Sequence, residues 1–155
     1  MLLSRDHNKW NYDIIMELLQ GPLLNPKRLD EVIKATKFIR RLFSFLHPYN
    51  NRFSAILRTR VGGCVFTLLT HQPNYKWVRL ARALLTTMLI NPEGQKFLAD
   101  DKLLRQIVEC LTELDQYAGQ PASQPFFSVD RLEHTLSFGY FEMIGILTKH
   151  QVGIQ

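Results

Sequence analysis

From Leu84 to Leu114 the chain reads LLTTMLINPEGQKFLADDKLLRQIVECLTEL, and this stretch gives the clearest indication of how the chain folds. Its apolar residues recur three and four positions apart, the spacing of a helix with one buried side. Asn91 and Pro92 interrupt the pattern once, and Asp100 and Asp101 interrupt it again. Asparagine and aspartate are favoured caps of helix N-termini, and proline fits the first helical position. The stretch therefore predicts three helical segments with two sharp corners between them.

The same helical spacing runs through most of the remaining sequence. Asn25 and Pro26 repeat the cap and proline of the first corner, and the apolar stripe after them predicts one helix over 26–46. The other predicted helices lie at 10–19, 64–70, 75–90 and from Ser128 or Asp130 to about 147. All of the predicted regular structure is helical, so the fold class is predicted to be all-α.

The last predicted helix has an apolar centre. From Leu136 to Leu147 it is apolar nearly all round, with Glu142 as its lone charge, and this predicts that Phe141 and most of its neighbours are buried. Gly139 and Gly145 cost helix stability, and we expect them where neighbouring backbones pack closely.

Two segments of the sequence resemble each other. Residues 85–94 align without a gap on residues 144–153, and each segment joins the end of an apolar helix to a polar corner and a glycine. Such recurrence is typical of stacked helical repeats, in which each unit buries its apolar face on its neighbour. We therefore predict a single armadillo/HEAT-like helical-repeat segment, an α-solenoid, over residues 1–155, as part of a longer superhelix. The Gly- and Pro-containing stretch at 119–127 is predicted to be a flexible loop.

Composition narrows the class of protein. Of the 155 residues, 46% are hydrophobic and 21% are charged, as in ordinary globular domains, which argues against intrinsic disorder. The formal net charge of +5 weakly favours acidic partners, phosphates or anionic surfaces. Cys64 and Cys110 show no pairing or metal-binding pattern, so we expect reduced thiols in an intracellular protein. No apolar run approaches the roughly 20 residues that a membrane span requires, which favours a cytoplasmic location.

The sequence contains none of the common catalytic motifs. The five histidines, at 7, 47, 71, 134 and 150, show no metal-binding spacing. Gly62 and Gly63 are not followed by the lysine and hydroxyl residue of a phosphate-binding loop, and no Gly-x-Ser-x-Gly elbow occurs. We therefore predict that the protein is not an enzyme and has neither catalytic residues nor a metal site.

Lys37, Arg40 and Arg41 are the residues with a candidate binding role. They lie three and four positions apart in the helix predicted over 26–46, so they project from one side and can converge on a phosphate. The alternative is a basic face that is merely solvated. Because the three residues lie well inside that predicted helix, we expect its dipole to contribute nothing to anion binding.

Several motifs occur along the chain in the same order as in a known family. They are a tryptophan at 10, FIRRLFSFLHP at 38–48, NPEG at 91–94, KLLRQIVE at 102–109 and Leu-Ser-x-x-Tyr-Phe at 136–141. In this arrangement the chain resembles the middle region of Rictor, the large helical-repeat subunit of target of rapamycin complex 2 (TORC2). Each motif alone occurs in many helical repeats, so the resemblance rests on their common order over nearly the whole chain.

The resemblance implies a scaffold function. A Rictor-like segment would support assembly of the kinase complex and would offer surfaces to its partner subunits and substrates. The partners implied are the TOR kinase, the other TORC2 subunits and the flanking helical repeats of the same subunit, and no DNA is expected. The implied location is cytoplasmic, peripheral at membranes only through the complex.

The resemblance also bears on the basic residues. In Rictor relatives the corresponding helix contributes a shallow basic site that accepts an adenine nucleotide without hydrolysing it. Arg40 and Arg41 match that helix, and Lys37 replaces a third arginine. The chain departs from the family at Ser44, where an aromatic residue is expected, and at His7, where an amide is expected. Apart from this non-catalytic nucleotide, no cofactor is implied.

A second class of function stays open on the sequence alone. A free-standing basic helical domain would bind nucleic acid or anionic lipid, and binding through phosphates would weaken steeply with salt. The sequence lacks the exposed aromatic platforms that a single-strand binder uses. A small enzyme would require a cleft of which the sequence gives no sign.

Overall fold

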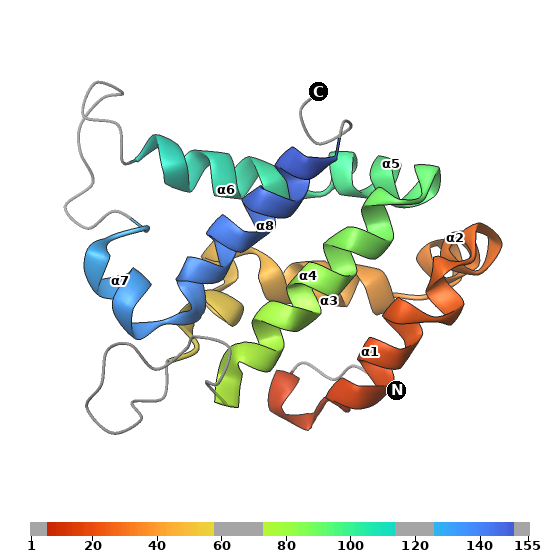
Figure 1. Ribbon diagram of the computed structural model, residues 1–155, viewed down its shortest axis with the longest axis horizontal. Coiled ribbons are helices and arrows are strands. Elements are labelled where there is room, and N and C mark those ends of the chain that lie inside the picture. The colour runs from red at the N-terminus through yellow and green to blue at the C-terminus, as the bar shows by residue number, and fades with distance from the viewer. Residues whose placement is uncertain (1–5, 58–72, 114–125, 151–155) are drawn as a thin grey trace.

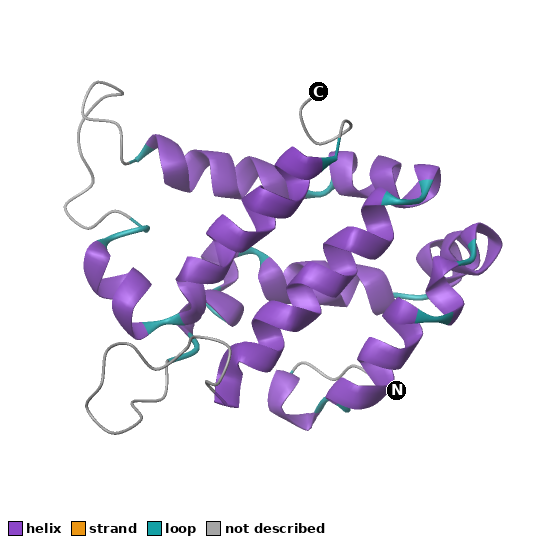
Figure 2. Cartoon of the chain, in the orientation of Figure 1, coloured by secondary structure: helices purple, strands orange, loops and turns teal. Residues whose placement is uncertain are grey.

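The computed structural model describes residues 6–57, 73–113 and 126–150 of the chain. Within these ranges the regular structure consists of α-helices and short 3-10 helices, with no strand (Figure 2). One isolated bridge pairs Leu57 with Thr135. The prediction of an all-α fold is confirmed.

The α-helices are α1 (Tyr12–Gln20), α2 (Pro26–Ala35), α3 (Phe38–Leu46), α4 (Lys76–Leu89), α5 (Pro92–Asp100), α6 (Lys102–Thr112), α7 (Val129–His134) and α8 (Gly139–Lys149). The 3-10 helices are η1 (His7–Lys9), η2 (Pro22–Leu24), η3 (Pro48–Asn50), η4 (Phe53–Ala55), η6 (Pro73–Tyr75) and η7 (Leu136–Phe138).

Helix α4 is central to the arrangement. It packs against α1 on one side and α8 on the other, and it meets α5 at a sharp corner (Figure 1). Helix α3 lies behind α4 in that view, and it contacts α2 and α6. Each helix thus buries one side on its neighbours, and the described chain is an armadillo/HEAT-like helical-repeat segment, as predicted.

The corners predicted around Asn91 and Asp101 are capped as expected. Asn91 Oδ1 accepts a hydrogen bond from the Glu93 amide (3.0 Å), and Asp101 Oδ2 accepts one from the Leu103 amide (2.9 Å). Asp101 Oδ2 also lies 2.7 Å from His47 Nε2. The side chain that begins α6 therefore also fastens this helix to the end of α3.

The prediction of a single helix over 26–46 is wrong. The chain forms two helices, α2 and α3, with a break at Thr36 and Lys37. The Thr36 hydroxyl donates to the Val32 carbonyl oxygen (2.7 Å) and accepts from the Phe38 amide (3.2 Å). Such bonding of a side chain to nearby backbone competes with the helical hydrogen bonds.

Three predictions fall wholly or partly outside the described residues. They are the helix at 64–70, the flexible loop at 119–127 and the end of the internal repeat at 151–153. The last two residues of the predicted loop, Phe126 and Phe127, are described, and both side chains are buried.

The prediction of one helix from Ser128 or Asp130 to about 147 is wrong, because the chain forms α7, η7 and α8 there. Tyr140 is fully buried, and its hydroxyl donates to the Leu46 carbonyl oxygen of α3 (2.6 Å). This bond fixes the rotation of α8 about its own axis. The next residue, Phe141, is turned outward and is 42% exposed, so the prediction that it is buried is wrong.

The glycines of α8 differ in their surroundings. A Cβ added at Gly139 would lie 2.9 Å from Phe53 Cζ, so this glycine is closely packed, but against side chains instead of the neighbouring backbone that was predicted. A Cβ at Gly145 would meet no heavy atom within 4 Å, so the same prediction is wrong for this residue. The tightest approach is at Gly94, where a Cβ would lie 2.7 Å from Met88 Cα and closer still to the Met88 carbonyl oxygen.

Gly94 and Gly145 give opposite predictions for the same substitution. Gly145→Ala should raise the free energy of unfolding by about 1 kcal/mol, because alanine has the higher helix propensity and the site is open. Gly94→Ala should lower it by about 1–3 kcal/mol, because the new methyl group meets backbone that cannot move aside. Urea denaturation followed by circular dichroism measures both. Equal changes in the free energy of unfolding for the two variants would contradict the packing described for these glycines.

Candidate functional site

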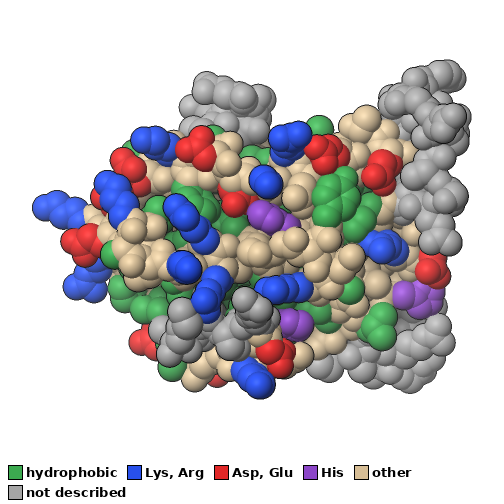
Figure 3. All heavy atoms as spheres, turned by 180° about the vertical axis from the view of Figure 1, so that it is seen from behind, with side chains coloured by type: hydrophobic (Ala, Val, Ile, Leu, Met, Phe, Trp, Pro, Cys, Tyr) green, Lys and Arg blue, Asp and Glu red, His purple; other side chains and the backbone are tan. Residues whose placement is uncertain are grey.

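The structure places the three predicted site residues at the N-terminus of α3. Lys37 is the N-cap, and Arg40 and Arg41 lie in the first turn. Lys37 and Arg40 are exposed, and Arg41 is half-buried. Lys and Arg side chains gather on this side of the molecule, opposite to the face in Figure 1 (Figure 3). The expectation that no helix dipole contributes here is therefore wrong, because it assumed a helix that began at Asn25.

Cations are unfavourably placed at this end of a helix. The N-terminus carries partial positive charge, and an exposed cation near it costs about 0.3–1 kcal/mol. The first turn of α3 contains no acidic residue, and Lys37 makes no side-chain capping hydrogen bond. Asp30 of α2 pairs instead with Lys34 (2.9 Å). A bound anion would interact favourably with both the basic side chains and the amides of the first turn.

His7 packs against α3 in an aromatic cluster. Its ring centroid is 5.0 Å from that of Phe45 and 5.2 Å from that of Trp77. Burial lowers the pKa of His7, and the neighbouring Asp6 carboxylate opposes this shift. Phe45 follows Arg41 by four residues, so both lie on one side of α3. The structure therefore brings His7 to the side of α3 that carries Arg41.

Ser44, the other departure from the family pattern, lies in a polar contact. Its carbonyl oxygen accepts from Asn50 Nδ2 (2.7 Å), and its hydroxyl oxygen accepts from the same group (3.2 Å). Ser44 follows Arg40 by four residues, so these hydrogen-bonding groups lie on the side of α3 that carries Arg40.

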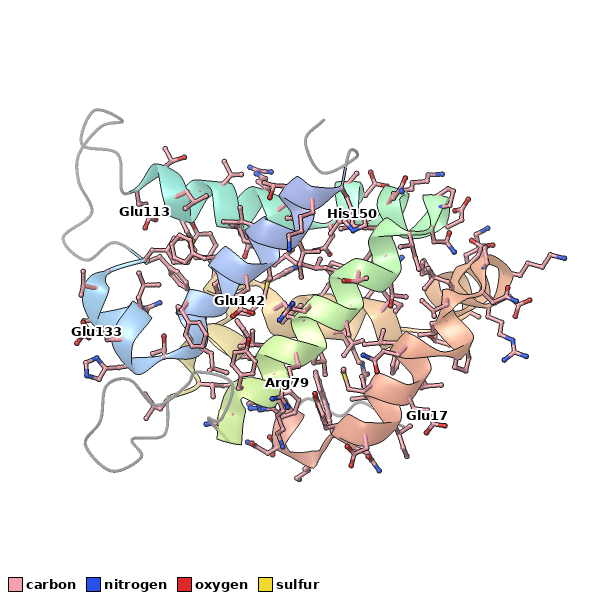
Figure 4. All side chains as sticks on the ribbon, viewed as in Figure 1. Glu17, Arg79, Glu113, Glu133, Glu142 and His150 are labelled. Carbon is pink, nitrogen blue, oxygen red and sulfur yellow. The ribbon has the colours of Figure 1, made fainter. Side chains whose placement is uncertain are left out.

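A second basic group, on α4, is absent from the sequence-based predictions. Lys76, Arg79 and Arg82 are exposed and follow one another at intervals of three residues, a signal that was present in the sequence. Arg82 Nη1 lies 3.8 Å from Glu142 Oε2 of α8, and the Arg79 guanidinium lies over the Tyr75 ring, 5.4 Å from its centroid. Figure 4 shows Glu142 between α8 and α4.

The Glu142 carboxylate is held by a tyrosine as well as by Arg82. The Tyr75 hydroxyl donates to Oε1 (2.9 Å) and Oε2 (3.0 Å) of Glu142. The pKa of Tyr75 is raised mainly by burial and secondly by this hydrogen bond. The lone charge of the apolar segment at 136–147 is therefore a link between α8 and the start of α4.

The remaining chemistry of the described residues is limited. They hold no group of three or more His, Cys, Asp or Glu side chains that could bind a metal ion. None of their helices combines the length and the apolar character needed to cross a membrane. Cys110 is buried, and burial raises the pKa of its thiol to about 11.

Comparison with known proteins supports the resemblance seen in the sequence motifs. The family model described as rapamycin-insensitive companion of mTOR, middle domain, matches residues 118–155. The chain is 39% identical over 153 residues to target of rapamycin complex 2 subunit ste20 of Schizosaccharomyces pombe. It is 36% identical over 155 residues to target of rapamycin complex 2 subunit TSC11 of Saccharomyces cerevisiae. Over nearly its whole length the chain is similar to subunits of the Rictor type. The resemblance found in its motifs is thus confirmed.

The Rictor-family relatives are much longer proteins. The two yeast alignments each cover 99% of this chain but only 11% of ste20 and 10% of TSC11. Protein pianissimo A of Dictyostelium discoideum is 32% identical over 168 residues, covering 100% of this chain and 13% of that protein. The chain therefore spans about a tenth of the length of the yeast relatives. No solved structure matches it.

The His7 cluster should make folding stability depend on pH. A histidine in an unfolded chain has a pKa near 6.5, and burial holds the pKa of His7 below that value in the folded chain. As the pH falls below about 6.5, the unfolded state therefore binds the proton first, and stability declines. Exchanging His7 for Phe keeps an aromatic ring and removes the titrating group.

We expect the stability of the parent chain relative to His7→Phe to be constant above about pH 7.5 and to fall as the pH is lowered from about 6.5 to 5. Urea denaturation of both proteins across this range provides the measurement. A difference that is the same at every pH would mean that folding does not change the proton affinity of His7.

Proposed function

We propose that the chain is a non-catalytic scaffold segment of a Rictor-like subunit of TORC2. The observation that carries the proposal is its 39% identity, over 99% of its length, to a TORC2 subunit. Both yeast relatives are named as subunits of a complex, which favours a role in assembly over a catalytic one. The segment would support assembly of the kinase complex and docking of substrates. Its partners would be the TOR kinase, the other TORC2 subunits and flanking helical repeats of its own subunit.

The outer side of α8 supports this role. Phe141, Ile144, Gly145 and Thr148 follow the spacing of one helix side. Phe141 is 42% exposed, and Gly145 has open space where a side chain would stand. Helical repeats bury such sides on neighbouring units. We propose that another helical unit of the complex covers this side of α8.

Phe141→Asp tests the scaffold proposal. In the full-length subunit that contains this segment, the change should reduce co-purification of the TOR kinase severalfold, because a charge would be buried in the contact. In the isolated chain it should lower the urea midpoint far less than a core substitution would, because Phe141 is 42% exposed, although its ring lies 5.1 Å from that of Phe127. Val129→Asp is the matched control, since Val129 is 71% exposed on α7. Normal assembly with Phe141→Asp would contradict the proposed contact.

We propose further that the N-terminus of α3 binds an anion, with an adenine nucleotide as the ligand that the family resemblance suggests. The support is electrostatic: Lys37, Arg40 and Arg41 lie where first-turn amides already favour negative charge. Ser44 and His7 depart from the family pattern, so binding would rest on the phosphates more than on stacking of the base. The ligand would be bound without hydrolysis.

The double variant Arg40→Ala/Arg41→Ala should abolish binding of a fluorescent ATP analogue. Removing cations from a helix N-terminus should not lower the melting temperature appreciably. The control Lys102→Ala/Arg105→Ala removes two exposed cations from α6 and should bind like the parent. Fluorescence anisotropy should show that the parent chain binds the ATP analogue more weakly as the salt concentration rises. Equal loss in both double variants would mean that only net charge matters.

The proposal includes a cytoplasmic location, with membrane association only through the complex. Imaging of the tagged full-length subunit, with and without the Phe141→Asp change, tests this part.

A further inference from the structure

We infer that the groove between α1 and α4 binds a short acidic, amphipathic segment of a partner protein. The groove has a volume of about 560 Å³. Its lining includes Met16, Leu24, Arg79, Arg82, Ala83 and Thr86. It is separate from the outer side of α8 and from the N-terminus of α3, so the inference goes beyond the proposed scaffold and anion sites.

The groove is formed before any ligand binds. The buried Thr87 hydroxyl donates to the Leu19 carbonyl oxygen (2.7 Å), which ties the last turn of α4 to the end of α1. Ile15 and Leu19 of α1 are fully buried, so this helix cannot shift without exposing core side chains. A preformed groove avoids part of the entropic cost of binding.

The floor of the groove is apolar. Met16 and Ala83 are half-buried, and Leu24 is 43% exposed although it is a large aliphatic residue. Thr86 adds a small side chain that leaves room above α4. These side chains fit the aliphatic side chains of a ligand.

The charge of the groove is positive. Arg79 and Arg82 belong to its lining, and Lys76 extends their stripe along α4. Glu142 is the carboxylate facing Arg82, but its contact with Nη1 is 3.8 Å long and its oxygens already accept from Tyr75. Glu17 of α1 points away from α4 (Figure 4).

An incoming carboxylate can therefore compete for Arg82. The Arg82 side chain is 52% exposed, so its 3.8 Å contact with Glu142 is weakened by solvent. A carboxylate that approaches directly can form the shorter, two-point contact that the arginine fork favours. Apolar floor and basic wall together fit an amphipathic segment that presents leucine-like side chains on one side and glutamate or aspartate beside them.

The test uses two fluorescein-labelled ten-residue peptides and the 155-residue chain. One peptide carries leucines at helical spacing with glutamates between them, and the other has glutamine in place of every glutamate. Fluorescence anisotropy should show the glutamate peptide binding about tenfold more tightly, the expected gain from one charge-assisted contact. Equal binding of the two peptides, or no binding of either, would overturn the inference.

Two matched pairs of variants locate the binding. Arg82→Ala should weaken the glutamate peptide about tenfold, whereas Arg105→Ala, which removes an exposed arginine from α6, should not. Thr86→Trp should block the groove, whereas Thr112→Trp, at an exposed position of α6, should not. Thermal melts of all four variants should match that of the parent.

Equal loss in both members of either pair would place the peptide elsewhere and refute the inference. Phosphatidylserine vesicles provide the competing ligand class. If these vesicles bind and Thr86→Trp blocks them, while the glutamate peptide does not bind, the groove takes a membrane surface and the peptide inference is wrong.

Discussion

The burial of α4 is the constraint on which the other helices depend. Nine of its 14 residues are buried, and α1, α5 and α8 all pack against it. Near its start, Trp77 contacts Phe45 of α3, with ring centroids 5.5 Å apart. Near its end, Thr87 bonds the backbone of α1. One stripe of α4 is left facing outward, and it is the stripe with the basic residues. The packing of the apolar sides of α4 therefore determines where its charged side lies.

The basic residues at the N-terminus of α3 and those along α4 have different surroundings. This difference favours a different class of ligand at each place. At the N-terminus of α3, Arg40 and Arg41 lie beside first-turn amides, which also favour negative charge. Along α4, Arg79 and Arg82 lie beside an apolar floor, and Arg82 Nη1 lies 3.8 Å from Glu142 Oε2. A compact polyphosphate suits the first arrangement. A peptide with both apolar and acidic side chains suits the second, because only such a ligand covers the floor and reaches the arginines.

The sequence was sufficient wherever a structural feature depends on a few neighbouring residues. Asn91 and Asp101 begin α5 and α6 because each side chain bonds an amide two positions ahead. Thr36 also bonds only to nearby backbone, yet the sequence did not predict the helix break there. The reason is that the apolar residues keep the same helical spacing before and after Thr36. The α1–α4 groove depends on helices far apart in the chain, and only tertiary packing brings its walls together. The basic stripe could be seen in the sequence, but the floor beside it could not.

The rotation of α8 about its axis also depends on tertiary packing, and it bears on function. A segment that is apolar all round does not specify which residue faces the core, and here the Tyr140 hydroxyl decides it by reaching the Leu46 carbonyl oxygen. That choice turns Phe141 and Gly145 outward. A helical glycine costs about 1 kcal/mol relative to alanine, and among the described residues nothing approaches Gly145 closely enough to require it. Gly94, by contrast, is required by the backbone of Met88 within its own corner. An open glycine beside an exposed phenylalanine is what a second helix needs in order to approach closely, and this favours a contact of α8 with a neighbouring unit of the assembly.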